Sequence, residues 1–395
     1  MDIKKIVKEY EAEIISIRRA LHMIPELDTN LPETTKYVRD FLENLGLDVK
    51  TFSNSGMTAL IKGKNPGPTI AFRADMDALP VKEETGLEFA STNGNMHACG
   101  HDGHMAMLLV AAKIICSLRD RLTGNVLLIF QPAEETTGGA KVMIDEGCLK
   151  NPEVDRVVSL HIGSLFPEVR NEEVGIKKGP IMAAVDSFTA KIIGVGGHGA
   201  RPHECVDPIV ISSEIILSLQ KIISREINPV HGAVMTIGTF HGGNLVNVIA
   251  DEAIFQGTVR TLDPNDSSLI ERRTKEIISD IARANRAKAL VEYKKYYPAT
   301  VNDGETTAFV AMSAAKVVGK EKIVEIQEPS TGTEDVSLYL KEVPGTYFIL
   351  GSYKANCDGT MYPHHNSKFD IDESVLWIGT GVFVQCAIDY LAKVD

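Results

Sequence analysis

Three short apolar runs alternate with helical segments in the first half of the chain. The runs cover residues 69–74, 125–130 and 156–160 and are rich in Ile, Val, Leu and Phe. A continuous apolar run of this length is typical of a strand that is buried on both faces. Helical periodicity between the runs, as at 103–118, predicts helices that cover those faces. The sequence therefore predicts an α/β fold with a mixed, mostly parallel sheet flanked by helices.

A different order of elements begins near residue 184. Strands and helices are predicted there in the order β-α-β-β-α-β, at 187–193, 207–224, 233–240, 251–261, 266–283 and 288–295. This order is that of the ferredoxin-like unit. The chain then returns to helices and to an apolar strand at 346–350, which we expect to complete the first sheet. A chain of 395 residues is long enough for two domains. We predict a main domain at 1–183 and 298–395, with an inserted ferredoxin-like α+β domain at 184–297.

Polar side chains follow each of the three apolar runs. Asp75 and Asp77 follow the first run, Glu134 and Glu135 follow the second, and His161 follows the third. The carboxyl ends of parallel strands meet at one edge of a sheet, where open α/β sheets bind their ligands. The sequence therefore predicts a functional crevice at this edge.

Residues 96–104 read MHACGHDGH and contain three imidazoles, one thiol and one carboxylate. Cys99 and His101 alternate, so that their side chains would point the same way in an extended backbone. Thiolate and imidazole are donors that zinc and similar divalent metals prefer. Adjacent Glu134 and Glu135 are expected to leave the chain in opposite directions, so that one can bind a metal while the other acts as a general base. The alternative is a polar loop without a metal.

Composition limits the partners and the compartment. The net charge of −12 argues against non-specific binding to nucleic acid or to acidic membranes. We find no apolar run long enough to cross a bilayer, because the richest, 105–116, is short and carries Lys113. The charged N-terminus lacks the apolar core of a signal peptide. Six scattered cysteines, at 99, 116, 148, 205, 357 and 386, fit reduced thiols. We expect a cytoplasmic protein.

Two other functions fit parts of the sequence. Residues 194–199, GVGGHG, match the dinucleotide-binding pattern G-x-G-x-x-G after a strand. That pattern needs its last Gly to open a helix, whereas Arg201 and Pro202 intervene here, and we read the glycines as a turn that carries His198 into the crevice. The second alternative is a non-catalytic metal-binding protein. The spare acid Glu134 beside candidate ligands favours an enzyme.

Six blocks of sequence together resemble one family. They are FRADMDALP (72–80), MHACGHDGH (96–104), QPAEE (131–135), GGHGARPH (196–203), NVIAD (247–251) and HNSKFD (365–370). In this order, and over nearly the whole chain, they resemble the metal-dependent amidohydrolases that include hippurate hydrolase, N-acyl-amino-acid deacylases, N-acetyl-diaminopimelate deacetylase and the plant auxin-conjugate hydrolases.

The resemblance implies a di-metal exopeptidase-like site in the main domain. By motif, the metal ligands would be Cys99, His101, Glu135, His161 and His365. His365 is preferred to its neighbour His364 because the ligand of the family lies four residues before the aromatic residue, here Phe369. Asp75 resembles the supporting carboxylate that orients a ligand, and Asp102 and His104 are weaker candidates for such support. The two divalent ions could be zinc, manganese, nickel or cobalt.

The resemblance also implies a reaction and an assembly. The expected substrate is a small N-acyl amino acid or short peptide, whose amide bond is hydrolysed by metal-bound hydroxide with Glu134 as general base. His198 would stabilise the oxyanion, and in the wider family the equivalent histidine comes from the partner subunit. Asn247 and Arg260 resemble the pair that binds the substrate near its carboxylate. The inserted domain would act as a lid and form the contact of a homodimer or a larger assembly. The acyl group and the amino acid stay open.

Overall fold

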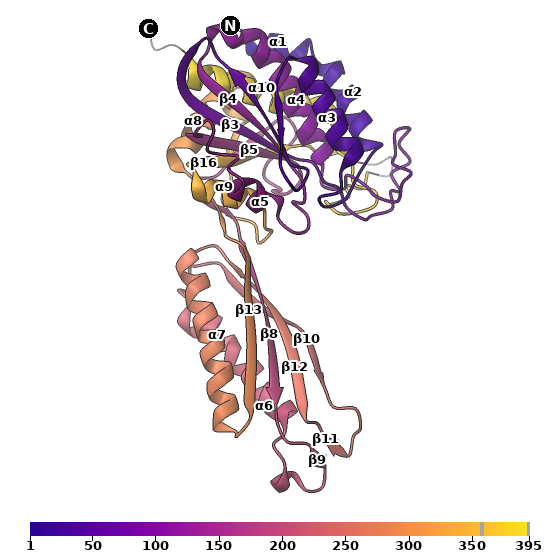
Figure 1. The fold of residues 1–395 in the computed structure, drawn as a ribbon, viewed down its shortest axis with the longest axis vertical. Coiled ribbons are helices and arrows are strands. Elements are labelled where there is room, and N and C mark those ends of the chain that lie inside the picture. The colour runs from indigo at the N-terminus through magenta and orange to yellow at the C-terminus, as the bar shows by residue number, and fades with distance from the viewer. Residues whose placement is uncertain (356–358, 393–395) are drawn as a thin grey trace. The chain divides into compact units, whose positions relative to one another are not determined.

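The structure, a computed structural model, describes residues 1–355 and 359–392 and forms two compact units (Figure 1). The larger unit consists of Met1–Ile181, Val301–Ser330 and Glu334–Asp395. The smaller unit consists of Met182–Thr300 and Thr331–Thr333. Each unit encloses an apolar core of its own.

The larger unit is built on a mixed sheet. Within the described residues this sheet has eight strands in the order β1-β2-β4-β3-β5-β16-β6-β15. Their bounds are β1 (Val49–Thr51), β2 (Met57–Lys62), β3 (Asn65–Asp75), β4 (Thr123–Gln131), β5 (Arg156–Gly163), β6 (Val174–Ile176), β15 (Ile323–Glu325) and β16 (Gly345–Gly351). The central strands β4, β3, β5 and β16 run parallel, and β16 pairs with β5 from far along the chain. The predicted mixed, mostly parallel sheet is confirmed.

Helices cover this sheet on both faces. They are α1 (Ile3–Lys8), α2 (Glu11–His22), α3 (Pro32–Asn44), α4 (His101–Leu118), α5 (Gly139–Asp145), α8 (Gly304–Val318), α9 (Val336–Glu342) and α10 (Leu376–Leu391). In Figure 1, α4 and α10 lie on one side of the sheet, and α5 and α9 lie on the other. Strand β16 is buried at every residue, as a strand covered on both faces must be.

One expectation about membrane spans was wrong. The segment Glu373–Leu391, which contains α10, is long and apolar enough to cross a bilayer by length and composition. However, 78% of its most apolar window is buried inside the protein. Helix α10 packs against α4 and α8, so its hydropathy is that of a core helix.

The carboxyl ends of the central strands position the candidate site. Strand β3 lies between β4 and β5, with Asp75 paired to Gln131 and Arg73 paired to Ser159. His161, which we expected just after its strand, lies inside β5, because this strand continues to Gly163. Two residues beyond Ser159, it reaches the level of Asp75 on the same edge of the sheet.

The smaller unit has an antiparallel sheet in the order β10-β12-β8-β13. Its elements are β8 (Ala184–Ile193), α6 (Pro208–Lys221), β10 (Ala233–Gly242), β12 (Glu252–Thr261), α7 (Pro264–Ala284) and β13 (Lys288–Tyr297). Burial alternates strictly along β8, as expected of a sheet with one face on the core. The order of elements and strands is that of a ferredoxin-like unit.

Short pairs and turns complete the chain. The pairs are β9 (Gly197–His198) with β11 (Val248–Ile249), and β7 (Gly179–Met182) with β14 (Thr300–Asn302). In the described residues, the 3-10 turns are Arg119–Arg121, Pro202–Glu204, Lys320–Lys322 and Glu373–Val375. A π turn covers Ile222–Glu226. Residues 194–199 contain β9 and continue into a turn, not into a helix, which removes the dinucleotide-binding interpretation.

Candidate metal centre

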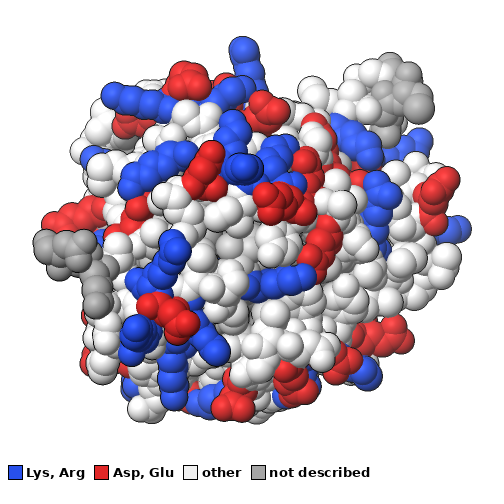
Figure 2. All heavy atoms as spheres, turned by 90° about the horizontal axis from the view of Figure 1, so that it is seen from above, with Lys and Arg blue, Asp and Glu red and all other residues white. Residues whose placement is uncertain are grey.

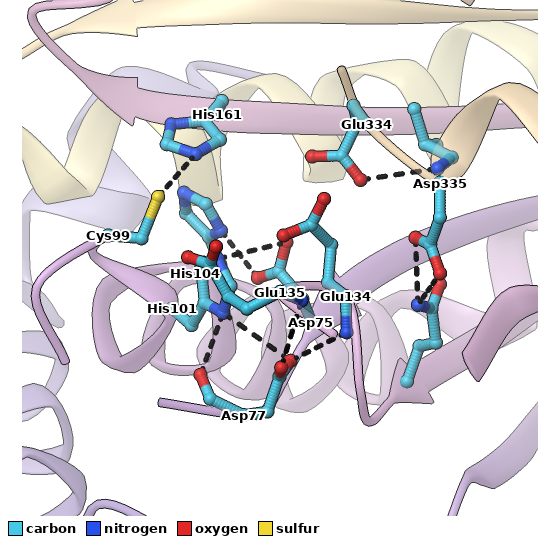
Figure 3. Close-up of polar contacts among 12 residues, drawn as sticks. Asp75, Asp77, Cys99, His101, His104, Glu134, Glu135, His161, Glu334 and Asp335 are labelled. Carbon is cyan, nitrogen blue, oxygen red and sulfur yellow. Dashed lines mark hydrogen bonds and ion pairs between the residues drawn. The ribbon is translucent and has the colours of Figure 1, made fainter. Parts of the chain in front are cut away.

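The five expected metal ligands lie together at the carboxyl edge of the larger sheet. Figure 3 shows Cys99, His101, Glu135 and His161 among them. The donor atoms of Cys99, His101 and His161 lie within 4.8 Å of one another. Those of Cys99, Glu135 and His365 form a second group within the same limit. Cys99 belongs to both groups, which bring together segments that are distant in the sequence. The side chains of Cys99, His101, Glu135 and His161 are largely buried, whereas that of His365 is more exposed.

We expected an extended backbone around Cys99, but the structure has a turn there. Gly100 has a φ of 87° and is the N-cap of α4, so that His101 is the first residue of a helix. The left-handed residue turns the chain between the two donors, and this turn keeps both of them near His161. A side chain at position 100 would place its Cβ 2.8 Å from Ile162 Cγ2. This position therefore requires glycine for both conformation and space.

Two histidines place their Nε2 atoms close to other candidate ligands. His101 Nδ1 lies 2.8 Å from the carbonyl oxygen of Asp77, and His161 Nδ1 lies 2.7 Å from that of Ile162. A carbonyl oxygen can only accept a hydrogen bond, so each Nδ1 carries a proton, and in the neutral ring each Nε2 keeps its lone pair. Among the described residues, the buried Nε2 of His101 has no hydrogen-bond partner. An imidazole fixed in this way fits a metal ligand.

His104 and Asp75 support the centre from behind. His104 Nε2 accepts a hydrogen bond of 2.9 Å from the backbone N–H of Ile162, so Nδ1 carries the proton and donates to Asp75 Oδ1 at 2.6 Å. Both nitrogens of His104 are therefore engaged. Asp75 Oδ2 lies 2.8 Å from Arg73 Nη1 and 3.6 Å from His101 Nε2. Burial opposes ionisation, but the neighbouring His101, His104 and Arg73 outweigh it and lower the pKa of Asp75 well below its usual value.

Asp102 has a different environment from the one we had expected. Its Oδ2 accepts hydrogen bonds from Arg18 Nε at 2.8 Å and from His22 Nδ1 at 2.7 Å. These contacts connect α4 to α2. In the described contacts, Asp102 does not bond to a candidate ligand. The expectation that it supports a ligand directly finds no basis in the described contacts.

Asp77 was expected at this edge of the sheet, but sequence reasoning assigned it no role in the site. Its two carboxylate oxygens accept hydrogen bonds from the backbone N–H groups of Glu134, at 3.0 Å, and Glu135, at 3.1 Å. Its carbonyl oxygen also holds His101, as described above. Its place directly after a buried strand was the only signal in the sequence.

The two adjacent glutamates do not diverge as predicted. Strand β4 ends at Gln131, and Ala133 has a φ of 57°, so the alternation of a strand does not continue into the turn. One donor atom from each of His101, Glu134 and Glu135 lies in a common group within 4.8 Å. Glu134 is therefore close to the ligands without being one of the five.

A network of buried charges surrounds Glu134. Burial raises the pKa of Glu134 well above its usual value, and the carboxylates of Glu334 and Glu135 raise it further. Arg73 is buried and donates to Glu334 Oε1 at 3.0 Å and to Asp335 Oδ1 at 2.8 Å. The pair at 334–335 carried no signal in the sequence, because it comes to the site only through the fold.

The donor set fits a divalent cation. Burial raises the pKa of the Cys99 thiol well above its usual value, and Glu135 and Glu134 add to this shift. A cation among these groups would reverse the effect and favour the thiolate. Sulfur, nitrogen and carboxylate donors together suit ions such as zinc.

The other predicted site residues belong to the smaller unit. His198 Nδ1 accepts a hydrogen bond of 3.0 Å from the backbone N–H of Ala200, so its Nε2 carries the proton. The carbonyl oxygen of Asn247 accepts from Gly199 N at 2.8 Å, which places Asn247 beside the His198 strand. Arg260 lies on β12, and burial lowers its pKa. In the described part of the chain, no carboxylate forms an ion pair with Arg260.

Comparison with known proteins identifies the family. The sequence model of peptidase family M20/M25/M40 matches residues 71–389. Thermostable carboxypeptidase 1 of Saccharolobus solfataricus is 42% identical over 397 residues, which cover 99% of this chain and 98% of that protein. N-acetyl-L-cysteine deacetylase of Bacillus subtilis is 40% identical over 368 residues, which cover 93% of this chain and 85% of that protein.

A solved structure shows the same fold. The YXEP protein of Bacillus subtilis, a dinuclear metal binding peptidase from the M20 family, aligns with a TM-score of 0.83 and 34% identity over 97% of this chain and 99% of that one. The family resemblance inferred from the six sequence blocks is confirmed. The chain therefore belongs to the peptidase family M20/M25/M40 and is a metal-dependent amidohydrolase.

Proposed function

We propose that the protein hydrolyses the amide bond of N-acyl amino acids, acetyl or aroyl, or of short peptides. The observation that carries the proposal is the placement of Glu134, a buried carboxylate within 4.8 Å of donor atoms of His101 and Glu135. A purely structural metal site has no use for an additional acid at this position. The carboxypeptidase and deacetylase among its relatives support the same class of reaction.

In this proposal Cys99, His101, Glu135, His161 and His365 hold two divalent ions, zinc, manganese, nickel or cobalt. Ions bound there would polarise the amide carbonyl and lower the pKa of bound water. Glu134 takes the proton of the attacking water and passes it to the leaving amine. Asp77 keeps Glu134 in place through the backbone of the glutamate turn.

The residues of the smaller unit are proposed to bind the substrate. The Nε2–H of His198 can donate to the oxyanion that forms on the amide carbonyl, because Nδ1 is already engaged by Ala200. Arg260, whose guanidinium has no carboxylate partner in the described residues, can bind the substrate carboxylate as a fork, with Asn247 as an additional polar contact. Asp75 orients the ligand side chains.

The adjacent glutamates offer a matched test of the base. We expect Glu134→Gln to keep its metal and lose at least ~100-fold in kcat, because general bases typically contribute this much. Glu135→Gln should lose metal affinity together with rate. Metal content by mass spectrometry and hydrolysis of N-acetyl amino acids measure both effects. Full turnover in metal-loaded Glu134→Gln would refute the assignment.

We further propose a homodimer in which the smaller unit forms the contact and His198 serves the partner's site. Co-expression of differently tagged His198→Ala and Glu134→Gln chains tests this arrangement. Each variant alone should be nearly inactive, and the purified mixed dimer should regain part of the activity, since one site then has both groups. A mixed dimer as inactive as the two parents places His198 in the same subunit as the site that it serves.

The proposal leaves the acyl group of the substrate open, and it places the protein in the cytoplasm. A screen of N-acetyl, benzoyl and dipeptide substrates after chelation and reloading with each candidate metal would identify the acyl group. Figure 2 shows basic and acidic side chains interspersed on the face that it displays, which fits a small-molecule substrate better than nucleic acid. All five cysteines in the described residues are unpaired, in line with a reducing cytoplasm, and Cys357 lies outside the described residues.

A further inference from the structure

The proposed ligand set leaves His364 without a role, although it lies next to His365. His364 Nε2 accepts a hydrogen bond of 3.1 Å from the backbone N–H of Ser164. A backbone N–H always donates, so this nitrogen is unprotonated, and in the neutral ring the proton sits on Nδ1. His364 Nδ1 lies 3.7 Å from Cys99 Sγ, within hydrogen-bond distance for sulfur.

The surroundings fix the ring in this orientation. Its centroid lies 4.5 Å from that of Phe369 and 5.2 Å from that of His161, edge to face with the latter. At Gly163 a Cβ would lie 2.3 Å from His364 Nε2, so the glycine leaves the space that the imidazole occupies. A ring held by packing on two sides and by a backbone N–H presents its Nδ1–H to the sulfur without reorganisation.

We propose that His364 is a positioning residue that donates its Nδ1–H to the Cys99 thiolate and is not itself a metal ligand. The inference rests on the proposed function, because it requires Cys99 to bind the metal. A hydrogen bond to the charged sulfur withdraws electron density from it and fixes its direction, and such supporting contacts typically change metal affinity by about 10- to 100-fold.

The two adjacent histidines then have different roles, one as a metal ligand and one as a hydrogen-bond donor to the thiolate. His365 Nε2 lies 3.3 Å from Glu135 Oε1 and belongs to the second donor group, whereas His364 contacts the thiol shared by both groups. The backbone N–H of His365 donates to the carbonyl oxygen of Ala98 at 2.8 Å, which ties this loop to the Cys99 loop. The loop thereby brings a metal ligand, His365, to the centre and a hydrogen-bond donor, His364, to the sulfur of Cys99.

Cobalt(II) tests the hydrogen bond through the thiolate-to-cobalt charge-transfer band. His364→Phe keeps an aromatic ring but removes the donor, so the sulfur lone pair rises in energy and the band should move to longer wavelength, with ~10- to 100-fold weaker cobalt binding. His364→Asn places an amide N–H near the original Nδ1 and should restore both quantities. Phe369→Leu loosens the packing of the ring without removing the donor and should move the band less than His364→Phe does.

Two further measurements separate the possible failures. Cys99→Ser must abolish the band; a band that persists in it means that Cys99 is not a ligand, and the proposed ligand set fails with the inference. Nitrogen-15 NMR of the zinc-loaded wild-type protein needs no variant at His364 and should show this ring as the neutral Nδ1–H tautomer. If His364 is protonated on Nε2, or if His364→Phe matches the wild type in band position and affinity, the inference is wrong while the proposed function stands.

Discussion

At the scale of single residues, Asp77 illustrates how one side chain organises the centre. Its carboxylate accepts from two successive backbone N–H groups, and its carbonyl oxygen fixes the tautomer of His101. Neither contact is with a metal ligand's donor atom. Asp77 positions the backbone of the two glutamates and the ring of His101, so its loss should lower both the stability and the metal affinity.

We predict that Asp77→Asn lowers the free energy of unfolding by about 1–3 kcal/mol, because an amide cannot accept from both buried N–H groups. Metal affinity should fall by about 10- to 100-fold. Asp28→Asn is the matched control, since Asp28 accepts from the exposed hydroxyls of Thr136 and Thr137 on the same turn and not from a backbone N–H in the described contacts. Denaturant unfolding and metal titration measure both effects; equal behaviour of the two variants would contradict the role of Asp77.

A second prediction at this scale concerns His22. Burial opposes its protonation, but Asp102, at 2.7 Å, and Glu83, at 3.1 Å, outweigh it and raise the pKa of His22 to about 9. The stabilisation from protonated His22 is complete below the unfolded pKa of about 6.5 and is lost as the pH rises through 9.

The expected loss is on the order of 3 kcal/mol between pH 6.5 and pH 9.5. Urea unfolding of wild type and His22→Gln should therefore give stabilities that differ most at pH 6.5 and converge toward pH 9.5. Parallel curves for the two proteins would mean that His22 does not titrate in this range.

At the scale of elements, the start of α4 decides the position of two donors. Gly100 is left-handed and packed against Ile162, and His101 follows as the first helical residue. Gly46, after α3, has a similar φ of 75°, but a Cβ there would meet nothing within 4 Å. The two glycines therefore separate the cost of the left-handed conformation from the cost of the contact.

We predict that Gly46→Ala costs about 1–2 kcal/mol of stability and leaves the metal affinity unchanged. Gly100→Ala should cost more and should also weaken metal binding, because Ile162 or the turn must move. Thermal unfolding and metal titration of both variants check this. Wild-type affinity in Gly100→Ala would show that the turn does not position Cys99 and His101.

At the scale of the whole molecule, the metal donors belong to one unit and the proposed substrate-binding residues to the other. The larger unit brings together segments near residues 99, 134, 161 and 365. The smaller unit has a separate apolar core. Metal removal should therefore loosen one unit selectively.

Hydrogen exchange with and without a chelator measures this effect. We expect faster exchange after chelation in residues 96–104, 131–136 and 361–369, and unchanged exchange in residues 184–297. Metal at 100 times its Kd should stabilise the protein by about 2.7 kcal/mol. Loss of protection spread equally over both units would contradict their independence.

The sequence by itself determined the type of fold and the family. Buried strands and their polar ends follow from local pattern, and Cys99, His101 and Glu135 stand in contiguous motifs. Only the tertiary structure decided the roles of Asp77, Arg73 and Glu334, because their contacts join segments up to 262 residues apart. It also corrected local geometry, at Gly100 and at the glutamate turn, where a left-handed residue ends the periodicity that the predictions assumed. Periodicity is a property of regular backbone, whereas a metal centre is built where strands end and the backbone turns.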